Sequence, residues 1–387
     1  MNILYFQVEN SASDLYEVLK RTNHTTNLYN KFLFGYTTAP DYILSDIATL
    51  LNNNHYDVAI SYLFFPELSD ICQKYEIKYA CYIYDSPLMN LYTDSIYNSC
   101  NEFFIFDKYQ LNDLARLNAP HLHYLPLAAN IERSDSLIIN DSDVLQYSSN
   151  ISFVGNLYND NSYDLIAPYL TDNMLAPVKC YLSDTLCNWS SVRRQPSVSD
   201  DILNFYLANT AFNLSDCGLM DPHRFLGISM LSRKLAQLER ITILNTAAAV
   251  SQVDLYTNDS HPALSPDIVL HSPVDYNTTA GKVYNLSKIN LNITLPSIES
   301  GVPQRVFDVM SYGGFLLTNY QPEIDELFEL DKDIVVFHSQ KEFIEKLVYF
   351  LTHENERLSI AINGYQKIRK LHTYTKRVEF ILNTIQQ

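Results

Sequence analysis

Residues 287–320 read SKINLNITLPSIESGVPQRVFDVMSYGGFLLTNY, and they give the clearest indication of the fold class. It begins with an apolar strand pattern at 288–294 and continues through a loop into a helical pattern from about 303 to 312. A glycine pair then ends the helix, because glycine readily adopts the backbone conformation found just past a helix C-terminus. A second strand pattern follows at 314–319. This succession of strand, helix and strand indicates a unit of a parallel α/β sheet.

Similar apolar runs recur along the whole chain. They are continuous rather than alternating, which is typical of strands buried on both faces of a parallel sheet. In the first part of the sequence they lie at 2–6, 57–65, 78–85, 102–107 and 122–130, and in the second part at 151–156, 241–245, 253–257, 267–271, 288–294, 314–319 and 333–338. Helical patterns lie among them, at 13–20, 108–117, 224–239, 303–312, 322–329 and 340–352. We therefore predict two Rossmann-like α/β domains.

The chain has 387 residues, which is too long for one typical hydrophobic core and suits two domains. The polar stretch 131–150 is expected to be a connection without regular structure. We place the first domain at 1–145 and the second at 146–367, with residues 368–387 forming a C-terminal helix that can cross back to the first domain. Gly364 is expected to interrupt the helical pattern near the end. Two facing domains imply a cleft between them.

The composition narrows the classes of partner. The formal charge is −17 without any block of lysines or arginines, which argues against nucleic acid or an anionic membrane surface as a partner. An anionic substrate would therefore need a local basic pocket. The first residues lack the pattern of a secretion signal, and no apolar stretch approaches the roughly 18 residues of a membrane span. We expect a cytoplasmic protein without an integral membrane span.

The helix that begins near Pro303 carries the first candidate binding residues. A helix that starts at the carboxyl end of a strand presents free backbone N–H groups and a partial positive charge, which favours a diphosphate. Arg305 in its first turn could add bidentate contacts to phosphate. Asp308, on the same face, could accept hydrogen bonds from ribose hydroxyls. The alternative is that Arg305 and Asp308 pair with each other on an exposed helix face.

Several motifs resemble one family over nearly the whole chain. GVPQRVFDVMSYGGFLLTNY (301–320) and the later GYQKIRKLHTYTKRVEFIL are similar to the C-terminal part of CgeB-type (spore-maturation-like) glycosyltransferases. FVGNLYND (153–160) and HSPVDYN (271–277) resemble that family in order and spacing, and YIYDSPLMNLY (82–92) resembles its usual N-terminal domain. The resemblance is weakest over about 160–220. It implies a GT-B fold, in which two facing Rossmann-like domains enclose an interdomain cleft.

The resemblance also implies an activity. It indicates a glycosyltransferase of the hexosyltransferase type that moves a sugar from a nucleotide-diphosphate donor, with a UDP-sugar favoured, to a hydroxyl acceptor on a protein or surface glycan. Asp308 matches the second acidic residue of a paired acidic motif of related retaining enzymes and is expected at the ribose. The first acidic residue should lie at Ser300, whereas the acid here is Glu299, which we expect near the donor sugar. Retention of configuration is the expected outcome.

The diphosphate is expected to bind near the loop that follows 151–156. Gly155 permits close backbone approach there and Asn156 follows it, but this loop lacks the nearby arginine and lysine of many relatives. The compensating cations are expected from elsewhere in the chain, and Gly301 belongs to the second loop of the same site. The candidate cations are Arg224, Lys288 and Arg305. Lys288 could instead be an exposed lysine at a strand edge, and Arg224 an ordinary residue of a helix start.

Asp85 is the candidate base that would activate the acceptor hydroxyl. It follows an apolar strand pattern, and side chains at the carboxyl ends of strands gather at the sites of α/β proteins. The alternative is that Asp85 caps a following helix that starts with Pro87. Asp107 has a similar placement.

No metal and no cofactor are expected. The six cysteines are scattered without metal-ligand spacing, and no Asp-x-Asp pair follows a strand pattern. The helix dipole and nearby cations would then stabilise the leaving diphosphate. Two other classes stay open: a catalytically silent protein that binds a nucleotide or glycan on the same fold, and a phosphorylase or epimerase of this architecture.

Overall fold

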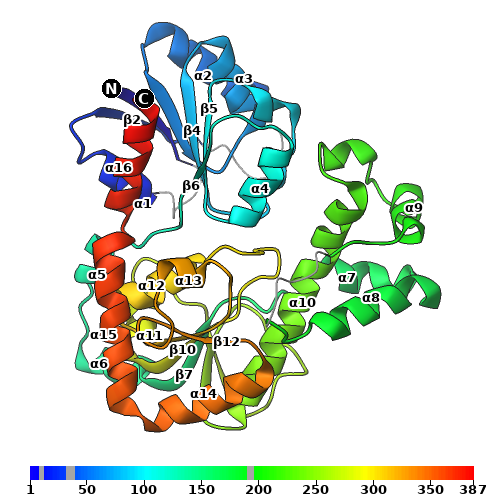
Figure 1. Cartoon of the computed structure of the whole chain (residues 1–387), viewed down its shortest axis with the longest axis vertical. Coiled ribbons are helices and arrows are strands. Elements are labelled where there is room, and N and C mark those ends of the chain that lie inside the picture. The colour runs from blue at the N-terminus through cyan, green and yellow to red at the C-terminus, as the bar shows by residue number, and fades with distance from the viewer. Residues whose placement is uncertain (8–12, 32–39, 190–195) are drawn as a thin grey trace. The chain divides into compact units, whose positions relative to one another are not determined.

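The computed structural model describes residues 1–7, 13–31, 40–189 and 196–387, and it confirms the predicted α/β class (Figure 1). The chain forms two compact units, each with a six-stranded sheet whose neighbouring strands are all parallel. The first unit comprises Met1–Ala128, Cys217–Leu219 and His372–Gln387, and the second comprises Ala129–Asp216 and Met220–Leu371. The first continuous part of the first unit ends at Ala128, whereas the polar connection suggested a boundary at residue 145.

The first unit has the strand order β2-β1-β3-β4-β5-β6. Its strands are β1 (Asn2–Phe6), β2 (Thr25–Tyr29), β3 (Val58–Tyr62), β4 (Lys78–Ile83), β5 (Asn101–Ile105) and β6 (Leu122–Tyr124). Its helices are α1 (Ser13–Leu19), α2 (Asp41–Asn53), α3 (Pro66–Lys74), η2 (Met89–Leu91), η3 (Asp94–Tyr97), α4 (Lys108–Arg116) and α16 (Tyr374–Ile385). The apolar runs did not predict β2, because this edge strand is mostly exposed and has a largely polar sequence.

The C-terminal helix α16 belongs to the first unit and packs against α1 and β4. Arg377 of α16 is buried, and its guanidinium donates hydrogen bonds to the carbonyl oxygens of Pro126 and Leu127 at 2.6 and 2.9 Å. Lys78 at the start of β4 donates to the carbonyl oxygen of Ile385 at 2.6 Å. These contacts tie the last residues of the chain to the first sheet.

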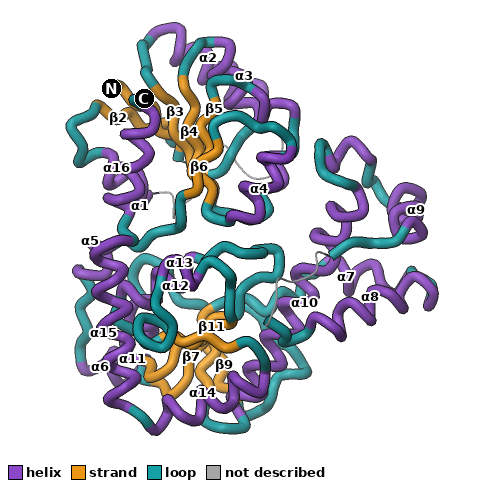
Figure 2. The backbone as a smooth tube through the Cα atoms, viewed as in Figure 1, coloured by secondary structure: helices purple, strands orange, loops and turns teal. Residues whose placement is uncertain are grey.

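The second unit has the strand order β12-β11-β10-β7-β8-β9. Its strands are β7 (Ser149–Val154), β8 (Val253–Tyr256), β9 (Ile268–His271), β10 (Ser287–Asn292), β11 (Leu316–Asn319) and β12 (Val335–Phe337). Its helices are α5 (Ile131–Asp135), α6 (Asp141–Tyr147), α7 (Ser162–Ile166), η4 (Ala167–Tyr169), α8 (Asp172–Thr185), α9 (Asp200–Asn209), η5 (Leu214–Cys217), α10 (Pro222–Ala248), α11 (Ala280–Leu286), α12 (Gln304–Ser311), α13 (Ile324–Leu327), α14 (Gln340–Thr352) and α15 (Glu354–Leu371). Figure 2 shows the strands of each unit grouped together with helices around them. No described helix is long and apolar enough to cross a membrane.

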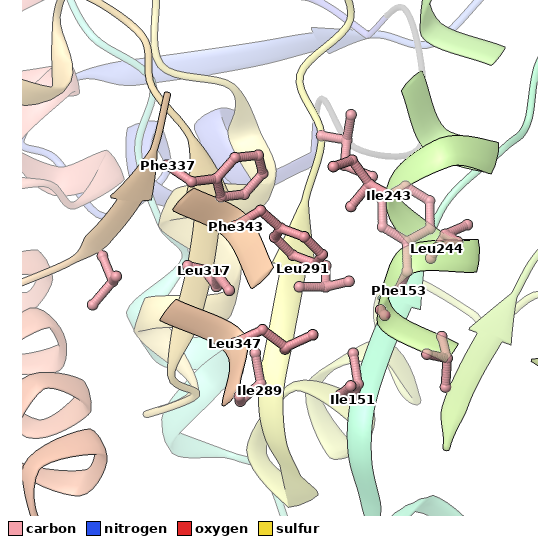
Figure 3. Packing of buried hydrophobic residues seen from close by; sticks show 14 of the residues in the cluster. Ile151, Phe153, Ile243, Leu244, Ile289, Leu291, Leu317, Phe337, Phe343 and Leu347 are labelled. Atoms are coloured by element: carbon pink, nitrogen blue, oxygen red, sulfur yellow. The ribbon is translucent and has the colours of Figure 1, made fainter. Parts of the chain in front are cut away.

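Buried aliphatic and aromatic side chains join the second sheet to the helices beside it (Figure 3). Ile151 and Phe153 of β7 and Leu291 of β10 are at most 1% exposed. They belong to one core cluster with Leu244 of α10 and Phe343 of α14. Burial of each such side chain stabilises the fold by about 1.5–3 kcal/mol. This core holds the carboxyl ends of β7 and β10 in fixed register.

The expectation of an irregular connection at 131–150 is wrong, because this stretch contains α5 and α6. Both helices are polar and lack a long apolar face, so the hydrophobic pattern did not reveal them. Asn130 and Asn140 cap them by accepting hydrogen bonds from the backbone N–H groups of Arg133 and Asp143. Local capping thus starts both helices.

The strand expected at 241–245 is also wrong, because these residues lie inside α10. This helix is buried along most of its length and passes through two cores. Its first half packs with α7–α9 in a separate helical cluster, and its second half packs under the sheet. A helix buried on several sides has no single apolar stripe, so a short run such as ITILN cannot be told from a strand by periodicity.

Gly364 does not interrupt the helix as expected, since α15 continues through it to Leu371. A Cβ atom on Gly364 would lie 2.5 Å from the backbone oxygen of Asp333 and 2.7 Å from Cε of Met310. The glycine therefore allows α15 to pack closely against the segment before β12 and against α12.

We expect Gly364→Ala to lower the free energy of unfolding by about 1–3 kcal/mol, because the overlap with backbone outweighs the better helix propensity of alanine. Chemical denaturation measures this change. Ser359→Ala, at an exposed position of the same helix, is the control and should be nearly neutral. An unchanged or higher stability of Gly364→Ala would contradict the close packing.

Candidate functional site

The second sheet reverses its strand order between β7 and β10. From β7 the chain proceeds to β8 and β9 on one side, and it then returns to β10, β11 and β12 on the other. All carboxyl ends lie at one edge because the strands are parallel. In open parallel sheets, ligands bind outside this edge at the point of reversal. Gly155 follows β7, and residues 293–303 follow β10, so both predicted loops flank this point.

Arg305 lies beside Gly155, as the sequence led us to expect. Its Nη1 donates to Oδ1 of Asn292 at 2.9 Å, and its guanidinium carbon lies 5.1 Å from the ring centroid of Phe153. A Cβ atom on Gly155 would lie only 2.7 Å from Nη2 of Arg305. Gly155 also has a φ of +156°, a conformation that side chains disfavour. The absence of a side chain at Gly155 thus leaves room for the guanidinium.

Arg240 is a second cation at this point, which the sequence reasoning missed. It is 3% exposed, and its guanidinium carbon lies 5.3 Å from the same Phe153 ring. It donates to the carbonyl oxygens of Asn156 and Ile293, the latter at 3.0 Å. Burial lowers the pKa of Arg240 to about 10, and the like charge of Arg305 acts in the same direction against the opposing effect of Tyr158. The sequence feature that could have indicated this residue is an arginine within the mainly apolar stretch LERITIL (238–244).

The guanidinium groups of Arg240 and Arg305 place two positive charges at this point, and no described carboxylate forms an ion pair with either of them. Among the described residues, neither Arg240 nor Arg305 has a carboxylate within ion-pair distance. Nε of Arg240 is buried without a hydrogen-bond partner in the same set. Buried charges in proteins are normally paired, because isolated ones are costly. The buried Glu239 acts on the charge of Arg240 without an ion-pair contact. Two neighbouring cations that no described carboxylate contacts therefore mark a site for an anion.

The loop after β7 is held in place by side chains from other segments. Oδ2 of Asp259 accepts hydrogen bonds from the backbone N–H groups of Leu157 and Tyr158 at 2.7 and 3.2 Å. The Tyr158 ring lies under the guanidinium of Arg240, 4.6 Å from centroid to carbon. The side chain of Asn156 is exposed, so its contribution to the site in this structure is its carbonyl oxygen.

Asp308 does not pair with Arg305, which excludes the simple alternative of a surface ion pair. Its carboxylate is 4% exposed and accepts hydrogen bonds from the Tyr276 hydroxyl at 3.1 Å and from Nε2 of Gln304 at 2.8 Å. The guanidinium of Arg133 lies 4.4 Å from the Tyr276 ring centroid. Asp308 thus organises the first turn of α12 and the loop after β9. Its predicted contact with ribose stays a prediction.

Arg224 and Glu299, proposed as separate ligands, lie against each other. Nη2 of Arg224 is 3.7 Å from Oε1 of Glu299, and both side chains are largely buried. Arg224 is also at the start of α10, where its backbone N–H donates to Asp221, the residue that caps the helix. The contact links α10 to the segment between β10 and α12, which also contains the buried Gly301.

Lys288 is not brought to this edge of the sheet. It is the exposed second residue of β10, whereas Asn292 at the other end of the strand contacts Arg305. Four residues of β strand span about 13 Å. The diphosphate role expected for Lys288 finds no support in this position and stays a prediction. A sequence pattern does not show which end of a strand faces the ligand. The alternative of an exposed lysine fits the structure.

Asp85 lies in the first unit, half-buried, just after β4. The helix expected after it is only the short η2, preceded by Leu88, so Asp85 does not cap an α-helix there. Asp107, by contrast, is fully buried, accepts a hydrogen bond from Ser86 at 2.7 Å and caps α4. Asp107 therefore has a structural role. The role of Asp85 as the acceptor base stays a prediction. The described residues include no group of three or more potential metal ligands.

Part of the sequence matches a known family. A family model described as glycosyl transferase-like matches residues 233–383, a range that contains Arg240, Arg305 and Asp308. No match was found among curated proteins. The match covers less than half of the chain and leaves out Gly155, and over the matched residues the sequence is glycosyltransferase-like.

Solved structures match the chain over its full length. HepE from Anabaena in complex with UDP-glucose shares 9% identity with a TM-score of 0.54, covering 100% of this chain and 99% of that one. A glycosyltransferase from Rickettsia africae shares 10% identity with a TM-score of 0.53, covering 100% and 97%. Sucrose-phosphate synthase from Thermosynechococcus elongatus shares 8% identity with a TM-score of 0.54, covering 100% and 98%.

The chain has the GT-B fold. At these identities the structural likeness establishes architecture, and the partial family match adds glycosyltransferase-like sequence within it. In this GT-B chain, the reversal point of the second sheet carries Gly155, Arg240 and Arg305. The site therefore combines the GT-B fold with concentrated positive charge.

Proposed function

We propose that this GT-B protein is a glycosyltransferase that takes its sugar from a nucleotide-diphosphate donor, with a UDP-sugar favoured. The observation that carries the proposal is the Arg240–Arg305 pair, two cations without a contacting carboxylate at the point where ligands bind to parallel sheets. Such a pair matches the charge of a diphosphate, and guanidinium groups bind phosphate bidentately. HepE of the same fold was solved with UDP and with UDP-glucose, which favours uridine as the base.

The same residues suit the chemistry of transfer. Breaking the bond between the sugar and the diphosphate builds negative charge on the leaving phosphate oxygens. Two fixed guanidinium groups beside the amino end of α12 would stabilise that charge without the assistance of a metal. Pro303 precedes α12, and the described residues provide no side-chain cap for this helix, which leaves its first N–H groups suited to a phosphate. Metal independence is part of the proposal.

The finer assignments rest on the resemblance to CgeB-type enzymes. They are Asp308 at the ribose, Glu299 near the donor sugar, retention of configuration, and a hydroxyl acceptor on a protein or surface glycan. Asp85 in the first unit is proposed as the base for that hydroxyl. The contact between Glu299 and Arg224 favours one rival, a protein that binds the donor without turning it over, because it engages the proposed sugar-contacting carboxylate.

Binding and turnover of nucleotide sugars test the proposal. We expect UDP and a UDP-sugar to raise the melting temperature, because a ligand at 100 times its Kd stabilises the folded state by about 2.7 kcal/mol. Uridine, which lacks phosphate, should have a much smaller effect. Hydrolysis or transfer should persist in EDTA, and NMR of the product reports its anomeric configuration.

Three outcomes separate the alternatives. Failure of every nucleotide sugar to bind at millimolar concentration would sink the enzyme hypothesis. Binding without hydrolysis or transfer, after a broad screen of protein and glycan acceptors, would favour the silent binding protein. A requirement for inorganic phosphate, or interconversion of the free sugar nucleotide, would indicate a phosphorylase or an epimerase.

A further inference from the structure

Three buried polar residues, the last residue of β11 and two that follow it, hold the segment that leads into α12. We call this segment, residues 293–303, the site loop. Asn319, Gln321 and Glu323 occupy alternate positions and are 1%, 5% and 1% exposed. Each of them forms hydrogen bonds with the site loop. So many polar groups in a buried place are unusual unless every one is satisfied.

The contacts run along most of the site loop. Oδ1 of Asn319 accepts from the backbone N–H of Thr294 at 2.7 Å. Nε2 of Gln321 donates to the carbonyl oxygens of Ile298 and Gly301 at 2.9 and 3.3 Å. The site loop is therefore fixed at its start and in its middle by neutral side chains.

Glu323 makes the charged contact of this group. Its Oε1 accepts a hydrogen bond from the Ser300 hydroxyl at 2.7 Å, and its backbone N–H donates to the carbonyl oxygen of Ser300 at 3.1 Å. Both contacts are made with Ser300, so the side chain and the backbone of Glu323 hold the site loop at the same residue.

The opposite side of the site loop is held by α10. Arg240 donates to Ile293 at the start of the loop, and Arg224 lies against Glu299 next to Ser300. The anion site itself, however, is made by Arg240, Arg305 and Gly155, none of which contacts Glu323. Arg240 thus serves both the site loop and the anion site, whereas Glu323 holds the site loop alone.

We infer that Glu323 is a positioning residue, which through Ser300 holds the site loop in the conformation needed for sugar transfer but is not needed to hold the diphosphate. The inference rests on the proposed function, because transfer is the step that it affects. The side chain of Glu323 acts on the loop and does not itself contact the reacting atoms.

The test compares Glu323→Ala, Glu323→Gln and Ser300→Ala. We expect Glu323→Ala and Ser300→Ala each to lower kcat about tenfold, with the Kd for UDP within about twofold of wild type. Glu323→Gln should retain most activity, because its amide oxygen can still accept from Ser300. The double variant should be no worse than either single one, since both remove the same contact. Glu326→Ala, at an exposed position nearby, is the control.

Hydrogen exchange gives a second measurement that does not depend on activity. We expect the amides of the site loop to exchange faster in Glu323→Ala than in wild type or Glu323→Gln, while those of β7 are unchanged. Equal losses of kcat and UDP affinity, additive effects of the two single variants, or unchanged exchange would overturn the inference. Absence of UDP binding by the wild type would instead count against the proposed function, and exchange would still test the role of Glu323.

Discussion

Replacing Arg305 with methionine is expected to weaken UDP binding about tenfold to 150-fold. A hydrogen bond to a charged group contributes about 1.5–3 kcal/mol, and a buried anion site loses that amount when one cation is removed. Methionine keeps much of the apolar length that packs on Phe153. Calorimetric titration with UDP measures the change directly.

The Arg305→Met variant should remain folded, because the substitution also removes the repulsion between Arg305 and the buried Arg240. We expect its free energy of unfolding without nucleotide to stay within about 1 kcal/mol of wild type, since one hydrogen bond to Asn292 is lost. Arg116→Met, at a side chain that is 71% exposed in the first unit, is the matched control. Unchanged UDP affinity in a folded Arg305→Met protein would show that the anion site is misplaced.

Arg240→Met is expected to have the largest effect of all, with more than about 100-fold loss of UDP affinity and lower stability. Arg240 supplies charge to the anion site, and it also satisfies the carbonyl oxygens of Asn156 and Ile293, which belong to the two loops of the site. A buried acceptor that loses its donor costs about 1–3 kcal/mol. Titration with UDP and chemical denaturation measure the two effects separately.

The variant Arg240→Lys distinguishes the contribution of the positive charge from that of the hydrogen-bond geometry of the guanidinium. Lysine restores a positive charge but is a compact ammonium that lacks the planar fork of arginine. We therefore expect partial recovery of UDP affinity without full recovery of stability. Arg116→Met, the exposed control described above, should change neither quantity appreciably. A fully active Arg240→Met protein would contradict the role of Arg240 in binding.

Much of the fold could be predicted because its signals are local. Continuous apolar runs marked most strands of both sheets, since strands buried on both faces contain few polar residues. The stretch 287–320 gave the order of strand, helix and strand around Arg305. Where local signals were absent, prediction failed: α5 and α6 are polar, β2 is an exposed edge, and α10 is buried on several sides.

The site was predictable only in part. Gly155 and Arg305 follow neighbouring strands at the reversal point, so strand order sufficed to bring them together. Lys288 lies at the opposite end of β10 from Asn292, and the pattern of a strand does not show which of its ends faces the ligand. Arg224 and Glu299 are far apart in sequence and close in space, so no local pattern indicated their contact.

Local sequence patterns were enough to predict the α/β class, most of the parallel strands and the position of Arg305 at the start of a helix, because hydrophobic periodicity and helix termini depend on neighbouring residues. The folded chain was needed to show that Arg240 lies with Arg305 at Phe153, and that Glu323 holds Ser300. Those contacts arise from packing between segments that are distant in the chain. A buried charged residue indicates a binding site only when the residues that contact it are known.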